Sequence, residues 1–328
     1  MTALCEPMLL KAAGKHSLWG GDKLIREYGK DYLEAPLAET WECSTHENGL
    51  SYVNSGVWKG RTLKSVLKEH PEFLGSKYSS LGELPIIVKF IDANKDLSVQ
   101  VHPNDEYAAR YENGSRGKTE IWYVVEAEEQ SRLIYGFYDN VSESIVREKL
   151  SDGNVLDILQ KVPVKKGDVF YIAPGTVHAL CGGVLVVEVQ ESSDLTYRLY
   201  DYDRLDKNGN KRLLQIDKAC RICNYKKSDN RLKRTKKYCY YKCGMISTIY
   251  QCVYFKIVRL VCRNTDGDLL RIPSAIDSFL VLICLTGKGL IRTDTNDLMF
   301  EKGDTIFIPY GIKNASVLGK CDLISVSC

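Results

Sequence analysis

Two stretches of the sequence decide the fold: KGDVFYIAPGTVH at residues 166–178 and KGDTIFIPYGIKN at residues 302–314. In each stretch a Gly-Asp pair precedes a short apolar run, a proline and a second glycine eight positions after the first. Glycine, aspartate and proline form turns, and the run between them has the length of one strand. Each copy therefore predicts a turn, a buried strand and a second turn that directs the next side chain inward. That side chain is His178 in the first copy and Asn314 in the second.

Strand-like runs rich in Val, Ile, Leu and aromatic residues surround both copies. They cover residues 84–91, 97–102, 120–126, 168–173, 183–191, 254–262, 278–285 and 304–309. Helical spacing of apolar residues marks residues 62–74 and 141–162. The Gly-Asp-strand-Pro-Gly unit resembles a sequence motif of cupins, which are small double-sheet β-barrels related to jelly rolls. The sequence therefore predicts a mainly β fold with two cupin (jelly-roll-like) barrels and a minor helical portion in the N-terminal half.

The composition is that of a globular protein, since 44% of the 328 residues are hydrophobic and 27% are charged. These values exclude a disordered chain, a collagen and a coiled coil, and the length suggests two folding units. The sequence shows no secretory signal and no apolar stretch of about 20 residues. We therefore expect a cytoplasmic protein without a membrane partner, and we expect its 12 cysteines to be mostly reduced.

Positive charge is concentrated in residues 221–243, which hold nine Lys or Arg and one Asp, whereas the whole chain has a formal charge of +3. One interpretation is a zinc knuckle built from Cys220, Cys223, Cys239 and Cys243. Another is nucleic-acid binding through the aromatic rings of Tyr225, Tyr238, Tyr240 and Tyr241. A solvated connector is the interpretation that we favour, so nucleic acid is not expected as a partner. The connector, residues 218–243, would join two domains. The first is a catalytic metal-binding cupin domain with helical segments (1–217), and the second is a cupin-like domain without metal ligands (244–328).

Two of the five histidines lie where a metal site is expected. His102 ends a predicted strand, and Gln100 shares its face because strand side chains alternate. Glu120 opens the next strand, and His178 follows the Gly-Asp unit. Two imidazoles, a carboxylate and an amide oxygen inside one barrel suit a divalent metal such as zinc, with an open position for substrate oxygens. A lone strand histidine is more often a satisfied polar residue, and this interpretation is kept for His16, His46 and His70.

The chain resembles type I mannose-6-phosphate isomerases, in the short form without the large helical insert, along most of residues 8–217. The matching motifs are LWGGDKL (18–24), AETWECSTH (38–46), LPIIVKFIDANKDLSVQVHPND (84–105), GKTEIWYVV (117–125), KGDVFYIAPGTVHAL (166–180) and EVQESSDLTYRLYDYDR (188–204). The resemblance implies one zinc ion per chain as cofactor. It places the metal ligands on Gln100, His102, Glu120 and His178.

The resemblance also implies that mannose 6-phosphate and fructose 6-phosphate are interconverted through a cis-enediol. It places the active-site arginine on Arg198, a substrate-site lysine on Lys118 and a position near the substrate phosphate on Ser98. Zinc and Arg198 would stabilise the negative charge that develops. Lys118 is a candidate for the base, whose identity stays open. Lys89, Ser98 and Arg198 are the candidates for binding the phosphate.

Each of these candidates has a structural alternative. Lys89 and Ser98 can be ordinary structural or surface residues, and Arg198 can form a salt bridge with Asp201 or Asp203. Two further functions also stay open. Two histidines and a carboxylate on a cupin also describe a metal-dependent dioxygenase. A non-catalytic bicupin that binds sugars or has a regulatory role is the third possibility. The sequence predicts a small sugar phosphate as substrate and makes no prediction of the oligomeric state.

Overall fold

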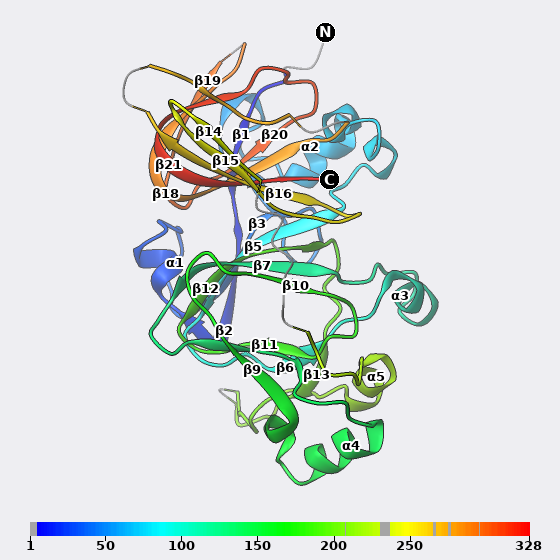
Figure 1. Ribbon diagram of the computed structural model, residues 1–328. Coiled ribbons are helices and arrows are strands. Elements are labelled where there is room, and N and C mark those ends of the chain that lie inside the picture. The colour runs from blue at the N-terminus through cyan, green and yellow to red at the C-terminus, as the bar shows by residue number, and fades with distance from the viewer. Residues whose placement is uncertain (1–4, 207, 230–236, 265–266, 275–276, 295) are drawn as a thin grey trace.

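The strands of the protein form three antiparallel sheets that are stacked as layers along the length of the molecule (Figure 1). This computed structural model describes residues 5–206, 208–229, 237–264, 267–274, 277–294 and 296–328. The ten-stranded sheet lies at the top of the view in Figure 1, the six-stranded sheet in the middle and the five-stranded sheet below it. The mainly β fold predicted from the sequence is confirmed.

The ten-stranded sheet combines strands from both ends of the chain. Its order is β14 (Lys237–Tyr241), β15 (Gly244–Gln251), β16 (Lys256–Arg263), β21 (Ser316–Ser327), β18 (Leu280–Arg292), β20 (Thr305–Ile308), β1 (Met8–Lys11) and β4 (Tyr52–Val53). Two more strands join it, β17 (Leu270–Arg271) beside β21 and β19 (Asp297–Glu301) beside β18. The N-terminal part of the chain therefore supplies β1 and β4 to a sheet that is otherwise C-terminal.

The other two sheets come from the N-terminal two-thirds of the chain. The six-stranded sheet has the order β10 (Val169–Ile172), β7 (Glu120–Ala127), β12 (Val184–Glu191), β5 (Ile86–Ala93), β2 (Ala13–Gly21) and β3 (Leu37–Cys43). The five-stranded sheet has the order β13 (Tyr197–Tyr200), β6 (Val99–Val101), β11 (His178–Leu180), β8 (Arg132–Phe137) and β9 (Leu159–Pro163). In the described part of the chain these pairings close no barrel, so the two predicted barrels are not confirmed.

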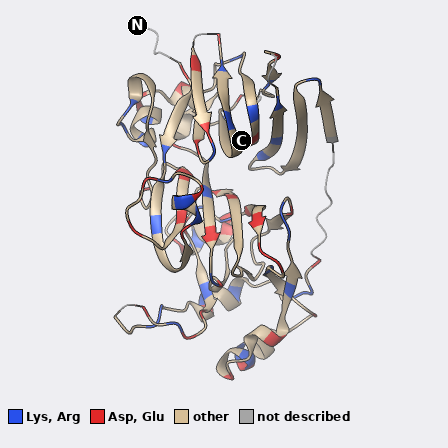
Figure 2. Cartoon of the chain, turned by 90° about the vertical axis from the view of Figure 1, so that its left-hand side faces the viewer, with Lys and Arg blue, Asp and Glu red and all other residues tan. Residues whose placement is uncertain are grey.

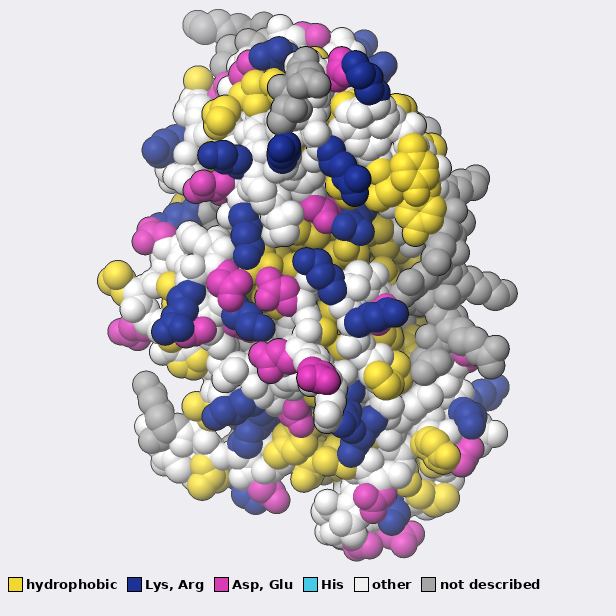
Figure 3. Space-filling view, turned by 60° about the vertical axis from the view of Figure 1, so that its left-hand side comes forward, with side chains coloured by type: hydrophobic (Ala, Val, Ile, Leu, Met, Phe, Trp, Pro, Cys, Tyr) yellow, Lys and Arg dark blue, Asp and Glu magenta, His cyan; other side chains and the backbone are white. Residues whose placement is uncertain are grey.

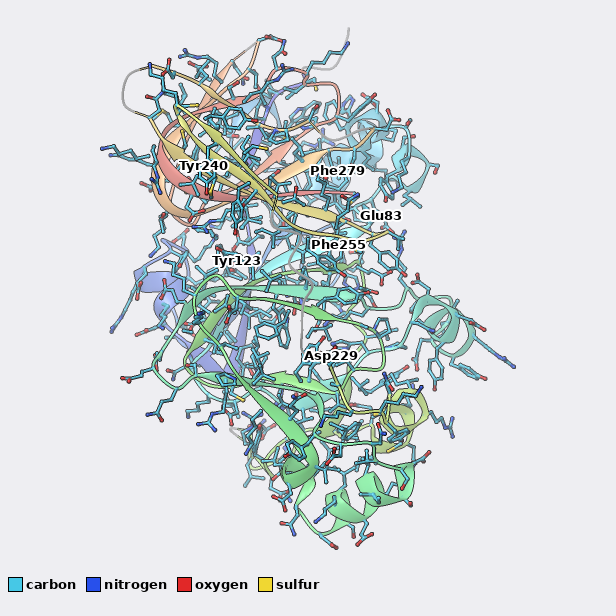
Figure 4. All side chains as sticks on the ribbon, viewed as in Figure 1. Glu83, Tyr123, Asp229, Tyr240, Phe255 and Phe279 are labelled. Atoms are coloured by element: carbon cyan, nitrogen blue, oxygen red, sulfur yellow. The ribbon has the colours of Figure 1, made fainter. Side chains whose placement is uncertain are left out.

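The six-stranded sheet is buried on both faces, which explains why its strands read as nearly continuous apolar runs. Along β7, Tyr123 and Val125 pack toward the ten-stranded sheet, whereas Trp122 and Val124 pack toward the five-stranded sheet. Figure 4 shows Tyr123 and Phe255 in the upper of these two interfaces. Because strand side chains alternate, Glu120 has the same orientation as Trp122 and faces the lower interface.

Helices cover the edges and the lower end of this stack (Figure 1). The α-helices are α1 (Lys23–Arg26), α2 (Leu63–Glu69), α3 (Asp105–Tyr111), α4 (Glu143–Ser151) and α5 (Ile216–Ile222). The 3-10 helices are η1 (Gly56–Trp58), η2 (Pro71–Leu74), η3 (Ser79–Leu81) and η4 (Val155–Ile158). None of the described helices is long and apolar enough to span a membrane.

The two Gly-Asp stretches form the predicted strands and turns, but the prediction that each directs a side chain inward is wrong for the second. Each gives a strand between two turns, β10 in the first and β20 in the second. Gly167 and Gly303 have φ angles of +85° and +92°, a region that only glycine adopts freely. His178 is fully buried after the first unit, whereas Asn314 is exposed after the second. The second unit therefore directs no side chain into an interior.

The helix predicted over residues 141–162 ends earlier than expected. Ser142 caps α4 by accepting a hydrogen bond from the backbone N–H of Ile145. The helix ends at Ser151, and Gly153 follows with a φ angle of +72°. The apolar residues beyond this turn form η4 and then β9, which pairs with β8. Apolar spacing alone does not distinguish this short strand from a helical turn.

Part of the basic segment lies outside the described residues, namely residues 230–236. Within its described part, Cys220 and Cys223 pack with the outer face of the five-stranded sheet, whereas Cys243 packs in the core of the ten-stranded sheet. Cys239 is exposed. The four cysteines thus belong to different places, which does not support a zinc knuckle. Elsewhere, charges of both signs are interspersed over the described chain (Figure 2), as they are on the face shown in Figure 3.

Candidate active site and metal centre

Three strands bring the predicted metal ligands together between the six-stranded and five-stranded sheets. Glu120 is the first residue of β7, His178 is the first residue of β11, and His102 directly follows β6. Gln100 lies in β6 and is the Cα partner of His178 in the pairing of β6 with β11. Because Val99 and Val101 pack on the outer face of this sheet, Gln100 faces the inside.

His102, Glu120 and His178 form one compact group. Their candidate ligand atoms all lie within 4.8 Å of one another. His178 Nε2 is 3.1 Å from Glu120 Oε1, and His102 Nε2 is 3.5 Å from Glu120 Oε2. His102 is 1% exposed, and the other two side chains are fully buried. Among the described residues this is the single group of three or more His, Cys, Asp or Glu side chains close enough to share an ion.

The protonation of the two imidazoles suits a metal ion. His178 Nδ1 lies 2.8 Å from the carbonyl oxygen of Thr176. A carbonyl only accepts, so Nδ1 carries the proton and Nε2 presents its lone pair to the group. Burial, together with the charge of Lys118, holds the pKa of His102 well below its usual value. The low pKa of His102 favours the neutral form that metals bind, and the bond from His178 Nδ1 orients that ring with Nε2 toward the group.

Glu120 supplies the negative charge of the group. Burial opposes its ionisation, but Lys118 and the two histidines outweigh that effect and hold its pKa well below the usual range. Neither of its carboxylate oxygens accepts a well-formed hydrogen bond from a described residue. Buried polar atoms are rarely left in this state. Two imidazole nitrogens and such a carboxylate match the donor sets of catalytic zinc sites, so the residues fit a divalent ion.

Lys118 and Gln100 lie beside this group. Lys118 Nζ is 3.0 Å from Glu120 Oε2 and 3.2 Å from His102 Nε2. The amide Nε2 of Gln100 is 3.4 Å from His178 Nε2. Lys118 thus lies against the His-Glu-His group, and its roles as substrate-site lysine and base stay predictions. Ligation by Gln100 stays a prediction, although its side chain ends next to one of the ligand atoms.

One pocket contains every residue predicted to contact the substrate. Its wall is formed by Trp19, Glu39, Lys89, Ile91, Leu97, Ser98, Gln100, Lys118, Trp122, Glu188, Asp194, Thr196, Arg198 and Arg212. Lys118 and Gln100 connect this wall to the metal group. Ser98 and Arg198 come from neighbouring chain segments on the five-stranded sheet, since Arg198 pairs with Gln100 across β13 and β6. The sequence motifs therefore converge on a single cavity.

Arg198 does not form the salt bridge that was considered as an alternative. Its Nε donates to Ser98 Oγ at 3.2 Å, and its Nη1 donates to the carbonyl oxygen of Leu213 at 3.2 Å. Asp201 instead forms ion pairs with Arg204 and Arg212, and Asp203 forms one with Lys211. The guanidinium of Arg198 therefore lies in the pocket wall with its charge unpaired by those carboxylates.

Lys89 is balanced by carboxylates within the pocket. Its Nζ is 3.1 Å from Glu188 Oε1 and 3.5 Å from Glu39 Oε2, and it lies 4.7 Å from the centre of the Trp41 ring. Burial disfavours its charge, but Glu188 and Glu39 outweigh burial and raise its pKa. Lys89 is therefore a cation whose charge is already neutralised, which distinguishes it from Arg198.

The sequence did not point to several residues of the pocket wall. Glu188 is the most informative, because it is 3% exposed within the apolar strand β12. The alternation along that strand places it on the same face as Val186, which packs toward the five-stranded sheet. A charged residue on the buried face of a strand indicates a functional site. The sequence shows this pattern at Glu188, which interrupts an apolar run. Arg212 carried no comparable signal, because it lies in a loop.

The remaining histidines lie outside the metal group. His70 packs against the rings of Trp58 and Phe73. His46 lies against Trp41, and His16 Nδ1 is 2.9 Å from the carbonyl oxygen of Pro36. The structural interpretation of these three residues agrees with their contacts.

The fold and the site together define a cupin-type protein with a buried His-Glu-His group next to a polar pocket. Residues 8–144 match the catalytic domain of type I phosphomannose isomerase, and residues 273–328 match the cupin domain of mannose-6-phosphate isomerase. The chain is 34% identical to the mannose-6-phosphate isomerase of Streptococcus mutans, over 98% of both chains. It is also 34% identical to mannose-6-phosphate isomerase ManA of Bacillus subtilis, over 97% of this chain and 98% of that one. The protein belongs to the type I mannose-6-phosphate isomerase family.

Solved structures agree with this assignment. A crystal structure of the mannose 6-phosphate isomerase from Bacillus subtilis superposes with a TM-score of 0.88 at 32% identity, covering 98% of this chain and 99% of that one. A phosphomannose isomerase from Salmonella typhimurium has a TM-score of 0.73 at 15% identity, with 98% of both chains covered. At that lower identity the likeness concerns the fold alone.

Proposed function

We propose that the protein is a zinc-dependent aldose-ketose isomerase that interconverts mannose 6-phosphate and fructose 6-phosphate through a cis-enediol. One observation carries the proposal. A buried His-Glu-His group lies beside Lys118, which lines a pocket, and Arg198, which forms no ion pair with a described carboxylate, lies in the wall of the same pocket. A metal-ligand set next to a cavity that also holds an arginine suits a substrate with both sugar oxygens and a phosphate.

The metal group would be held by His102, Glu120 and His178, with Gln100 as a fourth ligand. When bound, zinc supplies a Lewis acid for the sugar oxygens at C1 and C2. Lys118 lies at the same place, since its Nζ is beside Glu120 and His102. Charge that develops on the sugar oxygens would be stabilised by the fixed metal cation in a water-poor site.

The proton that moves between C2 and C1 needs a group that can accept and return it. We infer that Lys118 does this, because its side chain is buried, lines the pocket and is not needed as a ligand. Glu120 is excluded by its place in the metal group. Glu188 has both carboxylate oxygens engaged, one by Trp122 and the other by Lys89.

The phosphate would bind at the part of the pocket formed by Ser98 and Arg198. The hydroxyl of Ser98 is already oriented by the guanidinium of Arg198 at 3.2 Å. Lys89, whose charge Glu188 and Glu39 balance, is better suited to the neutral hydroxyl groups of the sugar. We further propose that residues 1–217 carry the chemistry, because Asn314 replaces the ligand His178 in the second Gly-Asp unit and is exposed.

A coupled assay tests the proposal. The purified protein is incubated with mannose 6-phosphate, and the formation of fructose 6-phosphate is followed with and without a chelator. We expect turnover that the chelator abolishes and that added zinc restores. Oxygen consumption without isomerisation would identify a dioxygenase instead. Sugar phosphate binding without turnover of the zinc-loaded protein would identify a binding protein.

A further inference from the structure

Three arginines lie close together next to the pocket, and two of them share a single carboxylate. Asp201 is 5% exposed and accepts hydrogen bonds from Arg204 and Arg212. Arg212 engages both of its oxygens, with Nε 2.7 Å from Oδ2 and Nη2 bonded to Oδ1. Arg198 is the third member, and its guanidinium has no contact with this carboxylate. Positive charge is therefore in excess at this corner of the pocket.

Arg212 and Arg198 differ from Arg204 in facing the pocket. Both of them line it, whereas Arg204 does not belong to its wall and donates instead to the carbonyl oxygen of Asp96. Nε and Nη2 of Arg212 donate to the two oxygens of Asp201. Nη1 makes no hydrogen bond within the described part of the chain. A guanidinium has five N–H groups arranged as a fork. Arg212 thus retains donors for a ligand.

The two arginines are fixed relative to each other. The backbone N–H of Arg198 donates to Gln215 Oε1 at 2.9 Å, and the backbone N–H of Gln215 donates to the carbonyl oxygen of Arg198 at 2.9 Å. Arg198 Nη1 also reaches the carbonyl oxygen of Leu213. The chain on both sides of Leu213 is therefore tied to β13. Such preorganisation lowers the entropic cost of binding a ligand between the two side chains.

Holding these cations together is unfavourable without an anion. Burial and the charge of Arg212 together lower the pKa of the Arg198 guanidinium below its usual value. Two guanidinium groups facing one pocket can each bind a phosphate oxygen pair, and a phosphate dianion would neutralise both.

We propose that Arg212 is a second phosphate-binding arginine, which forms a clamp with Arg198 for the phosphate group of the substrate and is held in place by Asp201. The identity of the sugar phosphate rests on the proposed function, but the anion site does not. Asp201 acts here as a positioning residue, because it contacts the substrate only through Arg212.

Calorimetric titration with inorganic phosphate tests the clamp in the full-length protein. The Arg212→Gln variant loses the charge and the fork, and Arg212→Lys keeps the charge alone. Arg204→Gln is the matched control, because it removes an equivalent partner of Asp201 that lies outside the pocket wall. We expect Arg212→Gln to weaken phosphate binding by about tenfold or more, and Arg204→Gln to change it by less than about threefold.

Kinetics with mannose 6-phosphate give the second measurement. Arg212→Gln is expected to raise KM by about tenfold, with a smaller change in kcat, and to make inorganic phosphate a weaker competitive inhibitor. Equal losses of phosphate affinity in the Arg212 and Arg204 variants would show a merely structural role and overturn the proposal, as would unchanged affinity in Arg212→Gln. Circular dichroism checks that each variant is folded, and Arg212→Lys, which retains a cation for Asp201, gives the comparison if Arg212→Gln does not fold.

The two proposals fail in different ways. If the protein does not isomerise mannose 6-phosphate but its phosphate affinity depends on Arg212, the proposed function is wrong and the clamp stands. If it isomerises the sugar and Arg212→Gln binds phosphate like the wild type, the clamp is wrong and the function stands.

Discussion

Trp122 connects the His-Glu-His group to Lys89 in the pocket wall through Glu188. The indole Nε1 of Trp122 donates a 2.7 Å hydrogen bond to Glu188 Oε2, and the two residues are Cα partners on β7 and β12. The same indole lies edge-on against the His178 imidazole, with ring centres 5.4 Å apart. The other oxygen of Glu188 reaches Lys89. One aromatic side chain thus orients a candidate ligand and a buried carboxylate together.

A Trp122→Phe substitution tests this connection. It keeps an aromatic ring against His178 but removes the hydrogen bond to the buried Glu188 carboxylate. Leaving a buried carboxylate without a hydrogen-bond donor typically costs about 1–3 kcal/mol, and we expect kcat/KM to fall by about tenfold. Trp58→Phe is the control, because the indole N–H of Trp58 has no hydrogen-bond partner among the described residues. Unchanged kinetics of Trp122→Phe would contradict the role given to the indole.

Metal content is predicted to depend on the His-Glu-His group. Elemental analysis of the purified protein should find one divalent ion per chain. His178→Ala should lose it, because a buried ligand cannot be replaced by water without loss of affinity. His70→Ala, outside the group, should retain it. Since a ligand that binds the native state alone stabilises it by mass action, chelation should also lower the Tm of the wild type and leave that of His178→Ala unchanged. Full metal occupancy in His178→Ala would refute the assignment.

Asp92 is predicted to make stability depend on pH. Its side chain is 2% exposed, and Oδ2 accepts a 3.0 Å hydrogen bond from the backbone N–H of Lys23. Burial outweighs this bond and raises the pKa of Asp92 from the usual 3.8 to about 6. Between these values the native state binds the proton more tightly than the unfolded chain does. The free energy of unfolding therefore falls as the pH rises through this window.

The Asp92→Asn variant removes this titration but keeps an oxygen that can accept the Lys23 bond. Urea denaturation at several pH values between about 4 and about 8 gives the difference in unfolding free energy between wild type and variant. We expect the wild type to lose stability relative to Asp92→Asn as the pH rises, with the difference constant above about pH 7. A constant difference throughout would show that Asp92 titrates normally.

A buried ion pair in the N-terminal part of the chain forms hydrogen bonds with the C-terminal part. Lys30 Nζ lies 2.7 Å from Glu42 Oε2 and donates to the carbonyl oxygen of Gly303. Thr305 Oγ1 donates to the same Glu42 oxygen at 2.8 Å. Glu42 is fully buried, so Lys30→Met would leave its charge without this cation.

Breaking one partner of a buried pair typically costs about 3–5 kcal/mol, and we expect Lys30→Met to lower the free energy of unfolding by this amount. Lys11→Met is the control, because Lys11 and Asp31 form an exposed pair, and such pairs contribute less than about 1 kcal/mol. Urea denaturation measures both variants. Equal effects of the two substitutions would mean that the buried pair contributes no more than an exposed one.

Much of the fold could be predicted from local patterns. The Gly-Asp units gave two strands and their turns, because positive φ angles at Gly167 and Gly303 require glycine. The sheets themselves could not be predicted, because strand pairing joins residues that are far apart in sequence. The short strand β1 shows this, since no local pattern indicates that Leu9 is the Cα partner of Ile306.

The site was predictable to the extent that its residues lie in recognisable strands. His102, Glu120 and His178 were placed by alternation and by the turn before His178, and the structure brings them together. Arg212 was missed, because its direction depends on Asp201 in another part of the loop. Contacts between loop residues have no periodicity that a sequence can reveal.

The pairing of β1 with β20 has a consequence for biosynthesis. A ribosome makes β1 long before β20, because most of the described chain lies between the two strands. Until β20 has left the exit tunnel, β1 has β4 as its one partner strand, and Met8 and Leu10 lack the cover that β20 gives. The nascent chain must therefore keep an apolar segment exposed while the other two sheets fold, as is common for chains that fold domain by domain. The ten-stranded sheet can be completed only once β18, β20 and β21 have all been translated.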